Sequence, residues 1–254
     1  MKTIALLGSV GGAGTTTLTA HLAGALSMLN RKTLSVDWCP DNFLRMHFGM
    51  SFGDRQGWAL NLLEQRDWYA AGYQSDSGLD FLPFGRVAND DELERLVAWM
   101  RSSPSVFAEK LDTLQMPADT IVLCDCPRAP SALRKQPVAA ADLVFVLAAP
   151  DPLSYGAAVQ LAAEISDAQQ VETIILLNKF DSTRRLDRDI SVLLNTQQKQ
   201  HLSPVQIHRD ESVREALACK QLVFDFSPSS QAAYDFTTLA TWTLARLGQA
   251  TESV

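Results

Sequence analysis

A glycine-rich run near the N-terminus brings together residue types that bind phosphate groups. It reads Gly8-Ser-Val-Gly-Gly-Ala-Gly-Thr-Thr-Thr17, after an apolar segment at residues 3–7 and before a segment with helical apolar spacing at residues 16–29. Glycines let the backbone curl so that successive N–H groups face an anion, and the start of a helix adds partial positive charge. This order of strand, glycine turn and helix predicts a nucleotide-binding phosphate loop.

The loop lacks a charge that phosphate loops usually carry. The common pattern ends in glycine, lysine and then serine or threonine, with the lysine on the β- and γ-phosphates and the hydroxyl on Mg²⁺. Here Thr15 follows Gly14 where the lysine is expected, and Thr16 supplies the hydroxyl. We therefore expect Thr16 to contact Mg²⁺, and the nucleotide to bind more weakly than in loops with the lysine.

The rest of the chain predicts the sheet that carries this loop. Short apolar segments alternate with helical patterns, which indicates an α/β fold with one doubly wound, mostly parallel sheet and helices on both faces. The expected strands are residues 3–7, 33–36, 79–83, 120–123, 143–147, 173–177 and 205–207. No linker divides the chain, so we expect a single nucleotide-binding domain at residues 1–248 and a short polar tail at residues 249–254.

Composition narrows the classes of function. Of the 254 residues, 46% are apolar and 20% charged, as in folded globular proteins, and the net charge of −7 argues against nucleic acid or an anionic membrane as a partner. The 4 cysteines are too few for a secreted disulfide framework, and the first apolar run is too short for an export signal. The longest apolar run, residues 143–149, is far below the ~20 residues of a membrane span. These features predict a cytoplasmic protein.

The phosphate loop resembles that of the MinD/ParA-type deviant Walker ATPases, which reads K-G-G-x-G-K-[ST]-T. This sequence matches the glycines and the final threonines but neither lysine, because Val10 and Thr15 stand in those places. In that family the first lysine reaches the nucleotide of a partner subunit and the second contacts its own. The resemblance implies a P-loop NTPase fold, ATP and Mg²⁺ as cofactors and a homodimer formed across the nucleotides. The implied nucleotide-binding residues of the loop are Gly11, Gly12, Ala13, Gly14, Thr15, Thr16 and Thr17.

Two further motifs resemble the switch segments of the same family. Asp37 matches the first switch acid and Asp125 the second, so both are implied to hold Mg²⁺ together with Thr16. Cys39 stands where the family has its water-orienting acid, and a neutral thiol cannot orient water as a carboxylate does. Asp41 is then the candidate catalytic acid, although it equally fits the cap of a turn beside a proline. Arg128, directly after the second switch, is the candidate cation for the phosphates.

The base-reading residues allow two interpretations. Asn178 ends an apolar segment at the place where the MinD/ParA family reads adenine with an asparagine amide. The same residues form Asn-Lys-x-Asp with Asp181, which is also the guanine-reading motif of GTPases. We favour adenine, because the Phe-Asp-Ser run that follows resembles ParA-like proteins. A second base-contacting segment, Ile-His-Arg-Asp-Glu at residues 207–211, adds His208 to the implied nucleotide-binding residues.

Nearly the whole chain resembles one branch of this superfamily, the BcsQ family of MinD-like proteins from bacterial cellulose-secretion operons. Its marks here include Cys-Pro-Asp-Asn at residues 39–42 and Leu-Pro-Phe-Gly at residues 82–85. The resemblance implies an ATP-binding, dimerising regulator or scaffold of a cellulose synthesis and secretion complex at the inner membrane, with slow or absent hydrolysis. Two alternatives stay open: an active ATPase that positions cargo, and a degenerate scaffold that binds no nucleotide.

The C-terminal segment bears on membrane contact. MinD ends in a basic amphipathic helix that binds membrane, whereas after Gln231 this chain has apolar residues at helical spacing and Arg246 as the single base. We expect a helix that packs on the core and no direct membrane insertion, so that recruitment to the inner membrane depends on partner proteins.

Overall fold

The computed structural model describes residues 1–87 and 89–252. Its strands form one seven-stranded sheet in the order β3-β4-β2-β5-β1-β6-β7. Every neighbouring pair is parallel except β3 and β4, which are antiparallel. The strands are β1 (Lys2–Gly8), β2 (Thr33–Asp37), β3 (Tyr73–Gln74), β4 (Asp80–Leu82), β5 (Ile121–Cys126), β6 (Leu143–Ala148) and β7 (Glu172–Leu177).

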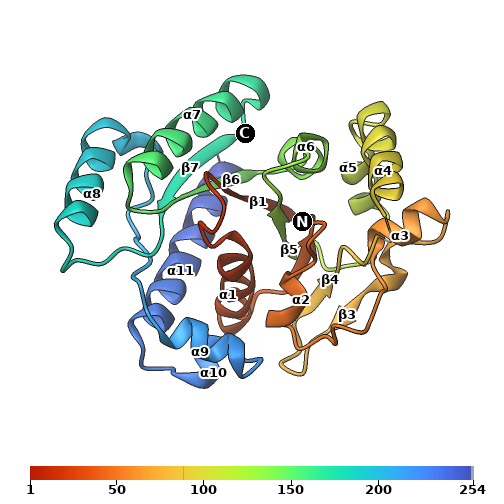
Figure 1. Cartoon of the computed structure of the whole chain (residues 1–254), viewed down its shortest axis with the longest axis horizontal. Coiled ribbons are helices and arrows are strands. Elements are labelled where there is room, and N and C mark those ends of the chain that lie inside the picture. Colours follow the sequence, from red (N-terminus) through yellow and green to blue (C-terminus); the bar gives the residue numbers. More distant parts are fainter. Residues whose placement is uncertain (88, 253–254) are drawn as a thin grey trace.

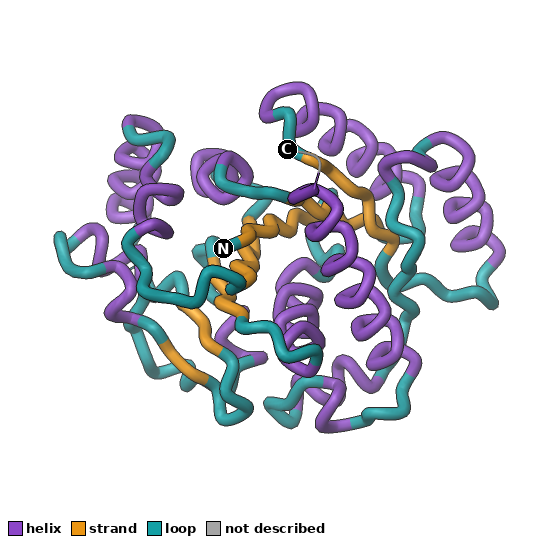
Figure 2. Tube along the Cα trace, turned by 180° about the vertical axis from the view of Figure 1, so that it is seen from behind, coloured by secondary structure: helices purple, strands orange, loops and turns teal. Residues whose placement is uncertain are grey.

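Helices cover both faces of the sheet, because alternate side chains of the central strands enter two separate cores. One face is covered by α3 (Trp58–Leu63), α4 (Asp90–Ser102), α5 (Val106–Asp112), α6 (Ser131–Ala139), α7 (Pro152–Gln169) and α8 (Arg185–Gln197). The other is covered by α1 (Thr15–Met28), α2 (Leu44–His47), α10 (Val223–Phe226) and α11 (Gln231–Glu252). The remaining elements are η1 (Trp68–Ala71), η2 (Lys199–His201) and α9 (Ser212–Ala218). Figure 1 shows the two layers, and Figure 2 shows the strands between them from behind.

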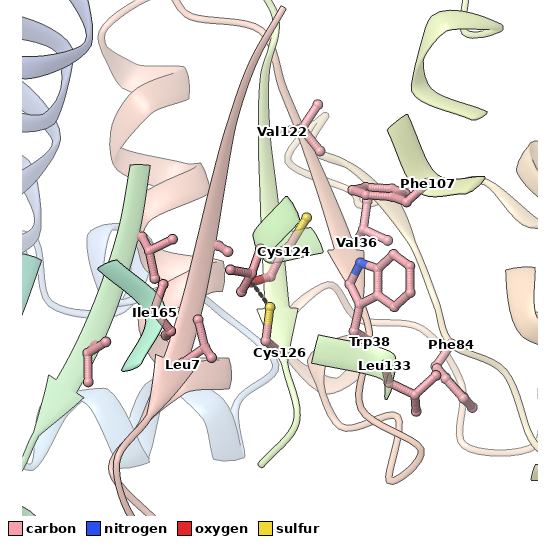
Figure 3. Packing of buried hydrophobic residues seen from close by; sticks show 14 of the residues in the cluster. Leu7, Val36, Trp38, Phe84, Phe107, Val122, Cys124, Cys126, Leu133 and Ile165 are labelled. Atoms are coloured by element: carbon pink, nitrogen blue, oxygen red, sulfur yellow. Dashed lines mark hydrogen bonds between the residues drawn. The ribbon is translucent and has the colours of Figure 1, made fainter. Parts of the chain in front are cut away.

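The α/β fold with a mostly parallel sheet is confirmed. On β1, Ala5 and Leu7 enter one core while Ile4 and Leu6 enter the other. Figure 3 shows the first core, in which Cys124 and Cys126 of β5 lie among Leu7, Trp38 and Phe107. All 4 cysteines are free thiols.

One expected strand is wrong. Residues 205–207 run beside β7, and the backbone N–H of Ile207 donates to the carbonyl of Leu177 at 2.9 Å. Only isolated bridges form in this part of the described chain, Ile175 with Leu202 and Phe180 with His208. The Ser203 hydroxyl accepts the backbone N–H of Val205 at 3.1 Å and donates to the Val205 carbonyl at 2.9 Å, so these two backbone groups do not join a ladder with β7.

The C-terminal helix packs as expected. Phe236, Leu239 and Leu247 of α11 are buried against the core that contains α1. The helix continues to Glu252, so it includes most of the predicted tail, and residues 253–254 lie outside the described residues. Among the helices of the described chain, none is both long and apolar enough to cross a membrane.

Candidate nucleotide-binding site

The parallel register brings the predicted site residues to one edge of the sheet. Asp37 at the end of β2 pairs with Asp125 near the end of β5. On the next strand, Leu7 pairs with Cys126, so the phosphate loop leaves β1 directly beside these acids. Ligands of doubly wound sheets bind at such carboxyl ends, where neighbouring connections leave in opposite directions. This topology therefore explains why residues far apart in sequence form one site.

The glycine loop has the backbone conformation that a phosphate cradle requires. Gly12 and Gly14 have φ of 76° and 100°, values that residues with a Cβ rarely adopt. Gly14 caps the N-terminus of α1, so the free N–H groups and positive dipole end of this helix face the loop. The loop borders a cavity of about 630 Å³. Its lining includes every loop residue predicted to bind nucleotide: Gly11, Gly12, Ala13, Gly14, Thr15, Thr16 and Thr17.

Asn178 joins the phosphate loop to the base side of the site. Its Nδ2 donates to the carbonyl of Ala13 at 2.7 Å, and its Oδ1 accepts the backbone N–H of Lys179 at 2.9 Å. The contact is close, because a Cβ on Gly14 would lie 2.4 Å from this Nδ2. A primary amide has two N–H groups and two acceptor lone pairs. One donor and one acceptor of Asn178 therefore remain for a base.

A second cavity of about 200 Å³ begins where the phosphate cavity ends, and both are lined by Gly14, Thr17 and Lys179. Asn178 and His208 line this second cavity. The ring of His208 is oriented by Asp235, whose Oδ2 accepts its backbone N–H at 2.8 Å and lies 2.9 Å from its Nδ1. This cavity has the position expected for the base.

Asp181, the acid of the guanine-reading interpretation, does not line the base cavity. Its carboxylate accepts hydrogen bonds from Thr183 and pairs with Arg184 at 3.1 Å. In this arrangement the carboxylate that would mark guanine lies outside the lining of the cavity that Asn178 borders.

Two buried carboxylates lie beneath the phosphate cavity. Asp37 and Asp125 are both fully buried, and one ligand atom from each, with the Sγ of Cys39, lies within 4.8 Å of the other two. Asp37 accepts the backbone N–H groups of Cys39 at 2.9 Å and Leu44 at 3.2 Å. Neither carboxylate oxygen of Asp125 has a hydrogen-bond partner of normal geometry among the described residues. A buried carboxylate without partners is costly, and a cation would remove that cost.

The electrostatics of this pair favour a bound cation. Burial raises the pKa of Asp125 to about 7, an effect that the neighbouring Thr16 hydroxyl partly offsets. Burial, and then the charge of Asp125, also raise the pKa of Asp37 well above its ordinary value. Hard oxygen ligands are what Mg²⁺ prefers, so Thr16, Asp37 and Asp125 are chemically suited to hold it.

Cys39 and Asp41 lie on the loop after β2 and both line the phosphate cavity. Burial and the nearby charges of Asp125 and Asp37 raise the pKa of the Cys39 thiol, so it stays protonated. Its Sγ donates to the backbone carbonyl of Asp125 at 3.6 Å. Asp41 is exposed, and it is the second residue after Cys39 on this loop.

The structure adds one residue that sequence reasoning missed. Arg128 lines the phosphate cavity as expected, but so does Lys179, whose Nζ donates to the carbonyl of Gly12 at 2.6 Å. Lys179 is the second residue of the Asn-Lys-x-Asp motif, which we considered only for base reading. The motif itself was therefore the signal, although nothing in the sequence showed the lysine beside the loop.

Comparisons with known proteins agree with this geometry. The family described as "Cellulose biosynthesis protein BcsQ" matches residues 1–244. The chain is 35% identical over 244 residues to the cellulose biosynthesis protein BcsQ of Escherichia coli K12, which covers 96% of this chain and 94% of that protein.

Solved structures support the same fold. The septum site-determining protein MinD from Pyrococcus horikoshii, complexed with Mg-ADP, superimposes with a TM-score of 0.78 at 19% identity and covers 98% of each chain. Cobyrinic acid a,c-diamide synthase from Mycobacterium smegmatis, with a bound ATP analogue and magnesium, gives a TM-score of 0.75 at 22% identity and covers 96% of this chain and 94% of that one. The fold is that of the MinD-like P-loop NTPases, and the chain belongs to the BcsQ family.

Proposed function

We propose that the protein is an ATP- and Mg²⁺-binding, dimerising regulator or scaffold of a bacterial cellulose synthesis and secretion complex, with slow or absent hydrolysis. Membership of the BcsQ family supports the role in cellulose synthesis. The observation that carries the nucleotide proposal is the unpartnered, buried carboxylate of Asp125 beneath an open glycine loop. Two structural relatives whose reported ligands include Mg-ADP, or an ATP analogue with magnesium, support the choice of cofactor.

The nucleotide is held by groups that this chain provides without the loop lysine. The N–H groups of residues 11–17 surround the phosphates, and Thr16, Asp37 and Asp125 would hold Mg²⁺, which neutralises part of the phosphate charge when bound. Asn178 and His208 line the base cavity, and the free donor and acceptor of the Asn178 amide fit adenine.

Hydrolysis is slow in this proposal because the loop after β2 has a thiol, not a carboxylate, at the position where the family orients the attacking water. Cys39 is a protonated thiol in place of the family's acid, and Asp41 approaches from the exposed side of the cavity. A positioned general base usually contributes ~10² to 10⁴-fold in rate. The bound nucleotide then persists long enough to act as a structural link between two subunits.

The assembly part of the proposal concerns location and partners. Two copies meet face to face across their nucleotides, and the dimer docks onto proteins of the cellulose secretion complex at the inner membrane from the cytoplasm. The net charge of −7 and the mostly buried apolar face of α11 argue against nucleic acid and against direct insertion into lipid.

Calorimetric titration with ATP, ADP and GTP, with and without Mg²⁺, tests the proposal. We expect ATP to bind in a Mg²⁺-dependent manner and more tightly than GTP, and Asp125→Asn to reduce the Mg²⁺ dependence. If no ATP binds at millimolar concentration and no nucleotide copurifies, the protein is a degenerate scaffold and the proposal is wrong.

A further inference from the structure

The phosphate cavity has few positive charges for the ligand it would hold. Neither Val10 nor Thr15 carries the lysine of related loops, and the first turn of α1 consists of threonines. ATP brings three to four negative charges, which backbone dipoles and one divalent cation only partly neutralise. The source of the remaining charge is therefore a structural question.

Two cations line the phosphate cavity in the described part of the chain, Arg128 and Lys179. Only one of them is held in place. The Nζ of Lys179 donates to the carbonyl of Gly12 at 2.6 Å, inside the glycine loop. The guanidinium of Arg128 makes no hydrogen bond with a described residue, and only its backbone carbonyl accepts one, from Arg134 at 3.3 Å.

The backbone brings Lys179 to the loop by an unusual conformation. Its φ is 60°, a left-handed value that non-glycine residues adopt mainly where the surroundings enforce it, often at functional sites. The preceding residue, Asn178, donates to Ala13 of the same loop at 2.7 Å. The side chains of Asn178 and Lys179 therefore donate to two successive backbone carbonyls of the loop, and these two hydrogen bonds restrict the position of the Lys179 ammonium group.

The ammonium group has capacity left for an anion. It carries three N–H donors, of which Gly12 uses one. No carboxylate lies within ion-pair distance of Lys179 among the described residues, although the chain is acidic overall. Burial, with the nearby charge of Arg209, lowers the pKa of Lys179. An anionic ligand would relieve this unpaired cluster of positive charge.

We propose that Lys179 supplies, from the base side of the site, the positive charge for the nucleotide phosphates that the loop lacks at positions 10 and 15. This inference rests on the proposed nucleotide binding and deepens it. Lys179 fixes the loop through Gly12 and leaves its other N–H donors toward the phosphate cavity, so it both shapes the cradle and neutralises its ligand.

The test compares Lys179→Gln and Lys179→Arg with the wild type in calorimetric titrations with Mg²⁺-ATP, ADP, AMP and adenosine. Lys220→Gln is the matched control, because Lys220 is also an exposed lysine with positive φ, at 56°, and lines neither cavity. Thermal unfolding of each variant checks the fold. Arg128→Gln measures how much the other cation contributes.

We expect Lys179→Gln to weaken ATP binding about tenfold or more, the size of one charge-assisted hydrogen bond. The loss should shrink from ATP to AMP and vanish for adenosine, and the salt dependence of ATP binding should fall. Lys179→Arg should retain most of the affinity, Lys220→Gln should match the wild type, and Arg128→Gln should lose less than Lys179→Gln.

Three results would overturn the inference. If the wild type binds ATP and Lys179→Gln binds it with the same affinity, the role of Lys179 is refuted while the proposed nucleotide binding stands. An equal loss for ATP and adenosine would place Lys179 on the base or ribose instead of the phosphates. A wild type that binds no nucleotide at all would refute the proposed function, and this inference with it.

Discussion

At the scale of single residues, the site depends on two buried acids that lie close together, Asp37 and Asp125. Asp125 lies on a central strand, and neither of its carboxylate oxygens has a hydrogen-bond partner of normal geometry among the described residues. Its pKa rises from 3.8 to about 7, because burial disfavours the charged form. Near pH 6 the unliganded protein therefore holds a proton where the liganded protein would hold Mg²⁺.

The raised pKa of Asp125 leads us to predict an unusual dependence of folding stability on pH. Between pH 4 and 7 the folded state binds more protons at Asp125 than the unfolded state, so this residue's contribution to stability falls as pH rises. Asp125→Asn removes the contribution, and we expect the variant to unfold at a higher temperature than the wild type at pH 8. One pKa unit corresponds to about 1.4 kcal/mol, so the difference across this range amounts to a few kcal/mol.

The measurement is the unfolding temperature of both proteins without nucleotide from pH 5 to 8. Their difference is the informative quantity, because His21 and His47, whose pKa values burial lowers to about 4 and 3, affect both proteins alike. A difference that stays constant over this range would show that Asp125 is ionised throughout. With Mg²⁺ and ATP, the wild type should recover the lost stability at pH 8.

The thiol of Cys39, in place of a water-orienting carboxylate, leads us to predict slow ATP hydrolysis. Restoring a carboxylate with Cys39→Asp should raise ATPase activity, and more so together with Thr15→Lys, since a positioned base contributes ~10² to 10⁴-fold. Cys39→Asn, similar in size but uncharged, is the matched control and should show no increase. Asp41→Ala should have a smaller effect on the wild type. Phosphate release assays measure all of these rates, and brisk wild-type turnover that Asp41→Ala abolishes would identify Asp41 as the working acid.

At the scale of elements, the strands that carry the site were predictable, whereas the two-residue strand at one edge of the sheet was not. Each central strand is a short apolar run buried on both faces, so its sequence pattern is unambiguous. β3 has only two residues and depends on pairing with β4, which no local pattern reveals. Trp58 and Trp68 are buried in the first core, against residues far from them in the sequence.

The residues of the candidate site also fall into those that the sequence predicts and those that it does not. Residues within one motif, such as the loop from Gly11 to Thr17, follow from the sequence because their spacing is local. The contact of Lys179 with Gly12 joins the carboxyl ends of β7 and β1, strands that are not neighbours in the sheet. Such a contact depends on sheet order and on the left-handed backbone at Lys179, and neither can be read from residue spacing.

The loop between β1 and α1 carries its own prediction. Gly14→Ala would place a Cβ 2.4 Å from the Asn178 Nδ2, on a backbone with φ of 100°. A left-handed backbone costs a residue with a Cβ roughly 1–2 kcal/mol, and the clash adds to this. We expect a lower unfolding temperature together with weaker ATP binding.

Gly11→Ala is the matched control for this loop, because a Cβ there meets no atom within 4 Å and the backbone φ is not in the left-handed range. Its unfolding temperature should stay close to that of the wild type. Equal destabilisation by both substitutions would contradict the packing of Gly14 against Asn178.

At the scale of the whole molecule, our proposal places the phosphate cavity of each copy at the contact between two copies. The phosphate cavity opens at the carboxyl ends of the strands, where the loops after β1, β2 and β5 meet. In our proposal a second copy closes this face, and the nucleotide contributes much of the contact. Slow hydrolysis would make the dimer long-lived, as suits a regulator or scaffold.

Light scattering coupled to size-exclusion chromatography tests this central claim most directly. We predict that Mg²⁺-ATP shifts the wild type from the mass of one chain toward that of two, and that Asp125→Ala weakens the shift because it loosens Mg²⁺. Identical masses with and without ATP, in the wild type and the variant alike, would contradict a nucleotide-dependent dimer.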